Sequence, residues 1–286
     1  GYMVRLHTGR PGYANDIADE VRLFAGREEI VLADEEDCDI SVTLTEENGL
    51  WRATAKANLN GKHAEYTFER PAYAGGALEV KRREKRAMKI AAFRALRSLY
   101  GVSPPWGSLT GIRPTRLLRE LIEREGEAEA LRMMAQDFDV SADKLALAAG
   151  IVAVQSPMLA GLTDGEADVY VNIPFCPSKC LYCSFPSKVR TEKDDMAAYL
   201  AALEKDVSLG AQLLHDCGRS VRALYVGGGT PTVLDAAELA RLLESLRRHY
   251  GGFGGEFTLE AGRPESITGE KLAVMKEYGV TRVSVN

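Results

Sequence analysis

The sequence predicts an α/β protein, in which part of a parallel βα barrel follows a small α+β domain and a helical connector. Three observations indicate this. The first hundred or so residues alternate apolar and polar side chains around two hairpin turns, a proline-rich break follows at 104–105, and strands alternate with helices from Asp168 onwards. Repeated βα units favour a parallel sheet with right-handed crossovers. We expect domains at residues 1–103, 104–165 and 166–286, the last one truncated at its fourth strand.

The first domain is expected to contain, in chain order, a strand around 4–6, a helix around 17–24 and strands over 38–44, 50–58 and 62–69. The dipeptides Asn48-Gly49 and Asn60-Gly61 indicate tight hairpins, because the turns that match strand twist need a positive φ at both central residues. The last three strands should therefore form an antiparallel meander.

A strongly basic helix is expected over 78–100, with Met88, Ala92 and Leu96 marking its inward face. Its eight lysines and arginines are Lys81, Arg82, Arg83, Lys85, Arg86, Lys89, Arg94 and Arg97. We interpret them first as a solvated cationic face. A surface that meets an anionic partner or substrate, or a nucleic acid, is the alternative, and binding to nucleic acid should then weaken steeply with salt.

The connector begins at the Pro104-Pro105-Trp106-Gly107 break. We expect three helices in it, over 114–123, 127–138 and 142–154, with Pro114 in the first turn of the first helix and Ser141 capping the last. Their apolar residues recur at helical spacing, and no group of side chains in this region predicts chemistry.

The last domain supplies the βα pattern. Its expected strands are residues 168–173, 223–226, 256–260 and 282–286, and its expected helices are 194–214, 235–250 and 270–278. A parallel strand is normally covered by a following element, whereas the last predicted strand meets the end of the sequence. We therefore expect the sequence to be a fragment of a longer protein.

Composition excludes several classes of protein. Hydrophobic residues make up 45% and charged residues 27% of the 286 residues, which is typical of a globular chain. No apolar run is long enough to span a membrane, and the first twenty residues lack the apolar stretch of a secretory signal. The net charge of −5 argues against binding nucleic acid through overall charge. Five cysteines, three of them close together, indicate a reducing compartment, and we expect a cytoplasmic protein.

Cys176, Cys180 and Cys183 follow a predicted strand with C-x3-C-x2-C spacing. Thiolates bind zinc or iron–sulfur clusters through their soft sulfur. Three interpretations remain open: packed thiols without a metal, a zinc site completed by Cys217 or His215, and an iron–sulfur cluster. A cubane held by three thiolates would keep one iron open for a small molecule, and this is the interpretation we favour.

Two further signals follow the next strands. The segment Gly227-Gly228-Gly229-Thr230-Pro231-Thr232 comes after the second strand, and Glu260 ends the third. The glycine run lacks the Lys-Ser/Thr of a P-loop, but glycine lets a ligand approach the backbone closely. In βα barrels the active site lies at the carboxyl ends of the strands. The cysteine loop, the glycine loop and Glu260 should therefore converge on one mouth.

The segment YVNIPFCPSKCLYC resembles the cluster loop of radical S-adenosylmethionine (SAM) enzymes. More narrowly, with GGGTPT and Glu260, it is similar to the oxygen-independent coproporphyrinogen III oxidase (coproporphyrinogen dehydrogenase) group, over residues 168–286. The segment PPWGSLTGIRPTRLL and the domain before it resemble the amino-terminal part of the HemZ-type branch. The resemblance implies a partial radical SAM barrel.

The resemblance also implies the cofactors and their ligands. A [4Fe–4S] cluster would be held by Cys176, Cys180 and Cys183, with SAM on the open iron, and an electron from the cluster would cleave SAM to a 5′-deoxyadenosyl radical. Contacts to SAM are implied for Tyr170 and Tyr182 (adenine end for Tyr182), Gly228, Gly229 and Thr230 (methionine end), and Glu260. No catalytic residue is implied beyond these.

The implied activity is oxidative decarboxylation of coproporphyrinogen III to protoporphyrinogen IX, in heme and porphyrin biosynthesis, with an external electron donor and acceptor. Two departures bear on it: Asn172 replaces the histidine of H-I-P-F-C, and Phe185 stands where many such oxidases have a further cysteine. The alternatives are a heme chaperone on the same scaffold and a radical SAM enzyme that acts on another tetrapyrrole. Arg263 or the basic helix would attract the anionic propionates.

Overall fold

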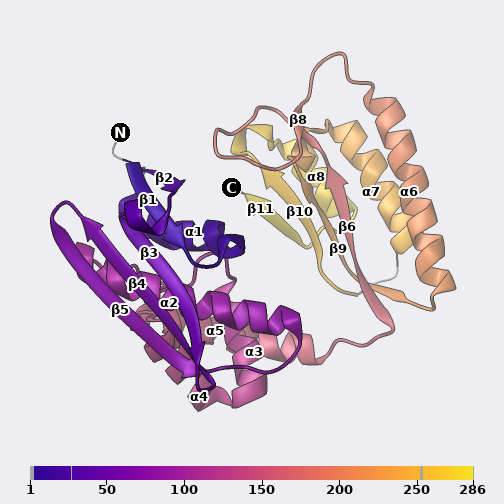
Figure 1. Ribbon diagram of the computed structural model, residues 1–286. Helices are drawn as coiled ribbons and strands as arrows, with labels where there is room; N and C mark the ends of the chain where they lie inside the picture. Colours follow the sequence, from indigo (N-terminus) through magenta and orange to yellow (C-terminus); the bar gives the residue numbers. More distant parts are fainter. Residues whose placement is uncertain (1–2, 27, 252–253, 286) are drawn as a thin grey trace. The chain divides into compact units, whose positions relative to one another are not determined.

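The structure is a computed structural model that describes residues 3–26, 28–251 and 254–285. The chain divides into two compact units, Gly1–Ala160 and Gly161–Asn286 (Figure 1). The finer division of the sequence into a first domain, a connector and a last domain stays a prediction. Among the described residues, no helix combines the length and the apolar character needed to cross a bilayer.

The first unit begins with a five-stranded sheet in the order β2-β1-β3-β4-β5. Its strands are β1 (Met3–Thr8), β2 (Glu29–Leu32), β3 (Ile40–Glu47), β4 (Leu50–Leu59) and β5 (Lys62–Pro71). β1 pairs in parallel with β2 and β3, whereas β3, β4 and β5 form the predicted antiparallel meander. Asn48, Gly49, Asn60 and Gly61 all have positive φ, so both predicted hairpins are confirmed.

Two helices, α1 (Ala14–Ala25) and α2 (Ala77–Tyr100), pack on this sheet. The core between them joins Val4 and Leu6 of β1, Ile17 of α1, and Met88 and Leu96 of α2, all fully buried. The sequence analysis did not predict β2. This short edge strand has no fully buried residue, so it carries no apolar alternation that could reveal it.

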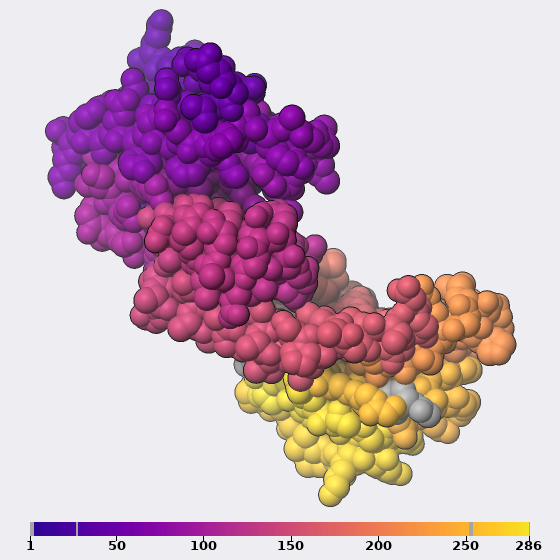
Figure 2. Space-filling view, turned by 90° about the horizontal axis from the view of Figure 1, so that it is seen from below, coloured from indigo at the N-terminus to yellow at the C-terminus, as the bar shows by residue number. Residues whose placement is uncertain are grey.

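The rest of the first unit is helical: α3 (Pro114–Glu125), α4 (Glu127–Arg132), a π-helical turn (Met133–Asp137) and α5 (Ala142–Ala160). The predicted helix over 127–138 is therefore two elements. A second core joins Leu118 and Leu121 of α3 and Met134 of the π-helical turn to Ile90 of α2. In Figure 2 the magenta surface of these helices adjoins the purple surface of the preceding strands. Short 3-10 turns lie at Pro11–Tyr13 and Glu35–Asp37.

The predicted solvated face of the basic helix is confirmed only at Lys81 and Arg82, which are exposed, and is wrong for the other cations. Arg86 and Lys89 are buried, and most other cations of α2 form ion pairs inside the unit. These pairs are Arg82 with Glu79 and Glu120, Arg83 with Glu79, Lys85 with Asp16, Lys89 with Glu20, and Arg94 and Arg97 with Asp139. The physical reason is that α2 packs against the sheet, α1 and the later helices, and these neighbours bring acidic side chains to its cations.

The second unit is a parallel sheet in the order β11-β10-β9-β6, as the βα pattern predicts. Its strands are β6 (Glu166–Ile173), β9 (Ser220–Gly228), β10 (Phe257–Gly262) and β11 (Arg282–Val285). Its helices are α6 (Met196–Asp216), α7 (Ala236–Tyr250) and α8 (Gly269–Glu277), with 3-10 turns at Pro231–Val233 and Pro264–Ser266. A small ladder, β7 (Phe175–Cys176) with β8 (Lys188–Val189), extends from β6. Asn286, in the last predicted strand, lies outside the described residues.

The two faces of this sheet differ. Val171, Val226 and Leu259 point to the side of the helices and are buried there. Tyr170 and Tyr225 alternate with these residues and are exposed. The alternation therefore leaves a polar face on the side of the sheet opposite the helices.

Candidate functional site

The cysteine loop follows the carboxyl end of β6. Cys176 ends β7, and its carbonyl oxygen accepts a hydrogen bond from the backbone N–H of Arg190 at 2.9 Å. A turn in which the N–H of Cys183 donates to the carbonyl of Cys180, at 3.1 Å, holds the other two cysteines. All three thiols are free and partly exposed. The loop is thus anchored at its first cysteine by the β7–β8 ladder and is open at the other two.

These three cysteines line one cavity of about 180 Å³. Tyr182 lies in its wall, as do Gly228 at the end of β9 and Gly229 and Thr230 after it. Gly262 at the end of β10 and Arg263 after it complete that side. The carboxyl ends of three neighbouring parallel strands therefore meet here, which is the placement expected for a βα active site.

The glycines allow the two loops to touch. A Cβ on Gly229 would lie 2.5 Å from the carbonyl oxygen of Phe175 and 2.9 Å from Sγ of Cys176. A Cβ on Gly228, which has a φ of 112°, would lie 2.1 Å from Oδ1 of Asn172. Both positions therefore need glycine, the first for space and the second for space and backbone conformation. Asn172, the departure from the histidine pattern, packs directly on this loop.

Glu260 and Tyr170 lie beside the cavity and not in its wall. Glu260 accepts a hydrogen bond from the Tyr225 hydroxyl at 2.7 Å and one from the backbone N–H of Gly228 at 3.2 Å. The first of these bonds, with burial, raises the pKa of Tyr225 to about 12. Tyr170 stacks on Tyr225 with ring centroids 5.7 Å apart. Glu260 thus ties the glycine loop to β10, and Tyr170 extends the same group along the polar face.

Two polar contacts of the cysteines were missed by the sequence analysis. Nη2 of Arg263 donates to Sγ of Cys180 at 2.9 Å, and Sγ of Cys176 donates to Oγ of Ser187 at 3.5 Å. Arg263 comes one residue after the end of β10, so the strand-end rule that selected Glu260 could have selected it as well. Cysteine binds iron as the thiolate, and Arg263 adds a hydrogen-bond donor at one of these sulfur atoms.

The zinc interpretation does not fit this arrangement. Cys217 and His215 lie at the end of α6, before the start of β9, whereas the cysteine loop lies at the carboxyl end of the sheet. The length of β9, about 25 Å at the usual rise per residue, separates the two ends. Within the residues that the structure describes, no three His, Cys, Asp or Glu side chains converge to hold a single ion.

A cubane cluster needs a different arrangement of ligands from a zinc ion, because each thiolate binds its own iron. The three sulfur atoms therefore need not meet at one point. The cavity supplies three thiols on its wall, a cation at one of them and the glycine loop packed against them. This donor set fits an iron–sulfur cluster with a small molecule beside it.

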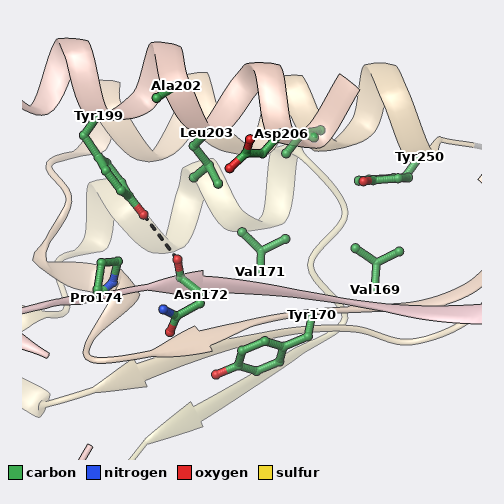
Figure 3. A pocket seen from close by; sticks show the side chains of 11 residues that line it. Val169, Tyr170, Val171, Asn172, Pro174, Tyr199, Ala202, Leu203, Asp206 and Tyr250 are labelled. Atoms are coloured by element: carbon green, nitrogen blue, oxygen red, sulfur yellow. Dashed lines mark hydrogen bonds between the residues drawn. The ribbon is translucent and has the colours of Figure 1, made fainter. Parts of the chain in front are cut away.

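A second cavity, of about 420 Å³, runs between β6 and helix α6. Figure 3 shows Val169 and Val171 pointing toward α6, while Tyr170 points to the opposite side of the strand. The Tyr199 hydroxyl closes one end by donating to the carbonyl oxygen of Asn172 at 3.2 Å. The lining contains none of the cysteines, so this groove is separate from the cysteine cavity.

The chain is similar in sequence to several known proteins. Residues 170–286 match the model of the radical SAM superfamily. An oxygen-independent coproporphyrinogen-III oxidase-like protein, HemZ of Bacillus subtilis, is 30% identical over 99% of this chain and 56% of its own length. The heme chaperone HemW of Mycobacterium tuberculosis is 35% identical over 46% of this chain and 34% of its own.

A solved structure of coproporphyrinogen III oxidase from Escherichia coli, described as a radical SAM enzyme, is 34% identical over 42% of this chain and 27% of its own. Its TM-score is 0.37, below the level at which a superposition argues for a shared fold. The chain spans about half the length of the HemZ relative and about a third of the chaperone.

Proposed function

We propose that the second unit, whose residues 170–286 match the model of the radical SAM superfamily, holds the [4Fe–4S] cluster of that superfamily through Cys176, Cys180 and Cys183. The observation that carries the proposal is the single cavity at the strand ends, whose wall contains the three thiols and the glycine loop. When bound, the cluster and SAM would supply one-electron chemistry at this mouth.

The chain's own residues would bind and orient these groups. Backbone atoms of Gly228 and Gly229 lie close to the cysteine loop and border the cavity in which the methionine end of SAM would lie. Thr230 borders the same space, and Tyr182 would cover the adenine end. Glu260 would act through the glycine loop that it holds, with the Tyr225 hydroxyl as its second partner.

Arg263 has a separate part in the proposal. Its guanidinium would remain beside the Cys180 sulfur and donate a hydrogen bond to it. Hydrogen bonds to ligand sulfur are one of the features by which a protein adjusts the potential of an iron–sulfur cluster. This leaves the propionates of a substrate to other cations, because Arg263 is already engaged with Cys180 and with Glu265.

We propose oxygen-independent oxidation of coproporphyrinogen III as the activity of the protein. The reaction removes two propionate carboxyl groups as carbon dioxide, leaves two vinyl groups and passes the released electrons to SAM and an external acceptor. The support is the similarity to the HemZ protein, which extends over 99% of this chain and therefore includes the first unit.

A heme chaperone is the second candidate. Two observations favour it: the similarity to HemW proteins of two bacteria, and Phe185 at the position where many oxidases have a further cysteine. Such a protein would use the same cavity without turning over a porphyrinogen.

One experiment separates the two. The anaerobically reconstituted protein is incubated with SAM, dithionite and coproporphyrinogen III, and products are identified by mass spectrometry beside a Cys180→Ala control. Vinyl-bearing porphyrin together with 5′-deoxyadenosine supports the oxidase, and neither should form in the control. Tight heme binding without porphyrinogen turnover would replace the oxidase proposal with the chaperone.

A further inference from the structure

Tyr225 of β9 connects two residues, Tyr170 and Glu260, for which the family resemblance implies contacts to SAM. Its hydroxyl donates to Oε1 of Glu260, on the neighbouring strand β10, at 2.7 Å. Its ring stacks on that of Tyr170, its cross-strand partner on β6, with the centroids 5.7 Å apart and the ring planes 20° apart. One side chain on the polar face of the sheet therefore holds both neighbours.

The Tyr225 hydroxyl fixes the Glu260 carboxylate together with the backbone of the glycine loop. Oε1 accepts from Tyr225, and Oε2 accepts from the N–H of Gly228 at 3.2 Å. Two donors on different oxygens set the orientation of the carboxylate, and each oxygen keeps a lone pair for a further donor. Because Gly228 also lines the cysteine cavity, the carboxylate is held next to the wall of that cavity.

Gly227, the first glycine of the run, leaves room for this arrangement. A Cβ at this position would lie 2.8 Å from Oε2 of Glu260 and 2.9 Å from Cε1 of Tyr225. Both atoms belong to the outer parts of side chains, so an added methyl group would push these side chains aside and leave the backbone in place. The close approach of Tyr225 and Glu260 therefore depends on glycine at this position.

We propose that Tyr225 is a positioning residue for SAM, which holds the carboxylate of Glu260 through its hydroxyl and the ring of Tyr170 through stacking. This inference rests on the proposed function, because it requires that SAM binds beside these two residues. Hydrogen bonds to a charged acceptor are stronger than neutral ones, and a side chain that is held in advance loses less freedom when a ligand binds. Removing the hydroxyl should therefore weaken SAM binding and leave the cluster intact, because Tyr225 acts on Glu260 and Tyr170 and not on the cysteine loop.

The test measures the dissociation constant of SAM by anaerobic equilibrium dialysis against the reconstituted chain, with the iron content determined in the same samples. Tyr225→Phe keeps the ring and removes the hydroxyl, so it should bind SAM about fivefold more weakly with unchanged iron content. Gly227→Ala should weaken SAM binding at least as much. Tyr13→Phe is the matched control, because the Tyr13 hydroxyl donates to Glu84 of the first unit at the same 2.7 Å. It should bind SAM as the natural chain does.

A double-mutant cycle distinguishes a positioning role from general damage to the fold. When Glu260→Ala has already removed the acceptor, adding Tyr225→Phe should weaken SAM binding by less than about twofold, because residues that act as a unit are not additive. Fully additive effects of the two substitutions would overturn the proposal. So would a Tyr225→Phe variant that binds SAM as tightly as the natural chain, and this result would leave the proposed function standing. A natural chain that holds no iron or binds no SAM would overturn the proposed function itself.

Discussion

Charged and polar side chains serve different purposes in the two units. In the first unit the cations of α2 are largely neutralised by partners such as Glu20, Glu79 and Asp139, and one of these pairs, Lys89 with Glu20, is buried. In the second unit the cysteine thiols, Tyr170 and Tyr182 remain partly or largely exposed around a cavity. The ion pairs of the first unit therefore mainly stabilise its fold. In the second unit, the side chains that could bind a cofactor lie at the carboxyl ends of the strands.

The comparison also corrects an inference from charge alone. A run of lysines and arginines in the sequence looks like a docking surface, yet most of these cations pair with acidic residues of the same unit, several of which lie far away in the chain. Three cysteines in one loop predict a cluster site more reliably, because their spacing is local. The fold has only to bring the other residues of the cavity next to that loop. The substitutions that follow change either the ion pairs of the first unit or the loops around the cavity of the second.

The largest effect is expected for Gly229→Ala. The new Cβ would meet the Phe175 carbonyl oxygen at 2.5 Å and Sγ of Cys176 at 2.9 Å, so the glycine loop must move away from the cysteine loop. We expect a loss of ~3 kcal/mol in the free energy of unfolding and a much reduced iron content after reconstitution. Denaturant unfolding and iron analysis measure both.

Gly269→Ala is the matched control, because a Cβ there meets nothing within 4 Å and the residue opens helix α8. It should leave both stability and iron content unchanged. Equal behaviour of the two variants would mean that the close approach of the loops is not required.

A smaller effect is expected for Asp139→Asn in the first unit. Asp139 accepts hydrogen bonds from Arg94 at 2.7 Å and from Arg97 at 2.8 Å, and asparagine keeps the size and tolerates the φ of 58°. Removing one partner of a largely buried pair should lower the free energy of unfolding by ~2 kcal/mol. Asp19→Asn breaks only an exposed pair with Arg22 and should cost less than ~0.5 kcal/mol. If the two variants lost the same stability, the pairs of α2 would not be structural.

The smallest effect is a pH dependence. Burial raises the pKa of Glu20 from 4.5 to about 7, against the opposing influence of Lys89 at 3.3 Å and the Thr110 hydroxyl. A raised carboxyl pKa means that the folded state binds the proton more tightly than the unfolded chain does. This stabilisation is present at low pH and is lost as the pH rises through about 7.

Glu20→Gln cannot titrate, so the stability of the natural protein should fall relative to this variant between about pH 6 and about pH 7, by ~1 kcal/mol. Urea unfolding of both proteins at several pH values measures the difference. A difference that stays constant over this range would mean that Glu20 has an ordinary pKa.

Much of the fold and part of the site follow from local sequence signals. The hairpins at Asn48 and Asn60 depend on two residues each, and the βα alternation of the second unit depends on periodicity. The meeting of the cysteine and glycine loops follows from the rule that the carboxyl ends of parallel strands share one edge. These signals are short in sequence and can be read without knowing which segments pack together.

The features that sequence reasoning missed depend on long-range packing. β2 is an edge strand without a buried residue, and Lys89 meets Glu20 across 69 positions of the chain. The contact of Arg263 with Cys180 spans 83 positions. In each case the contact forms only in the folded chain, and no local sequence pattern predicts it.

The other proposals depend on the three cysteines of the second unit holding an iron–sulfur cluster. Iron, sulfide and zinc are measured in oxygen-free, reconstituted protein, for the natural chain and for Cys176→Ala, Cys180→Ala and Cys183→Ala, with Cys217→Ala as the control. We expect a brown protein with about four irons and four sulfides per chain, which the control keeps and each of the three variants loses. A colourless protein loaded with zinc, or variants that keep the full iron content, would contradict it.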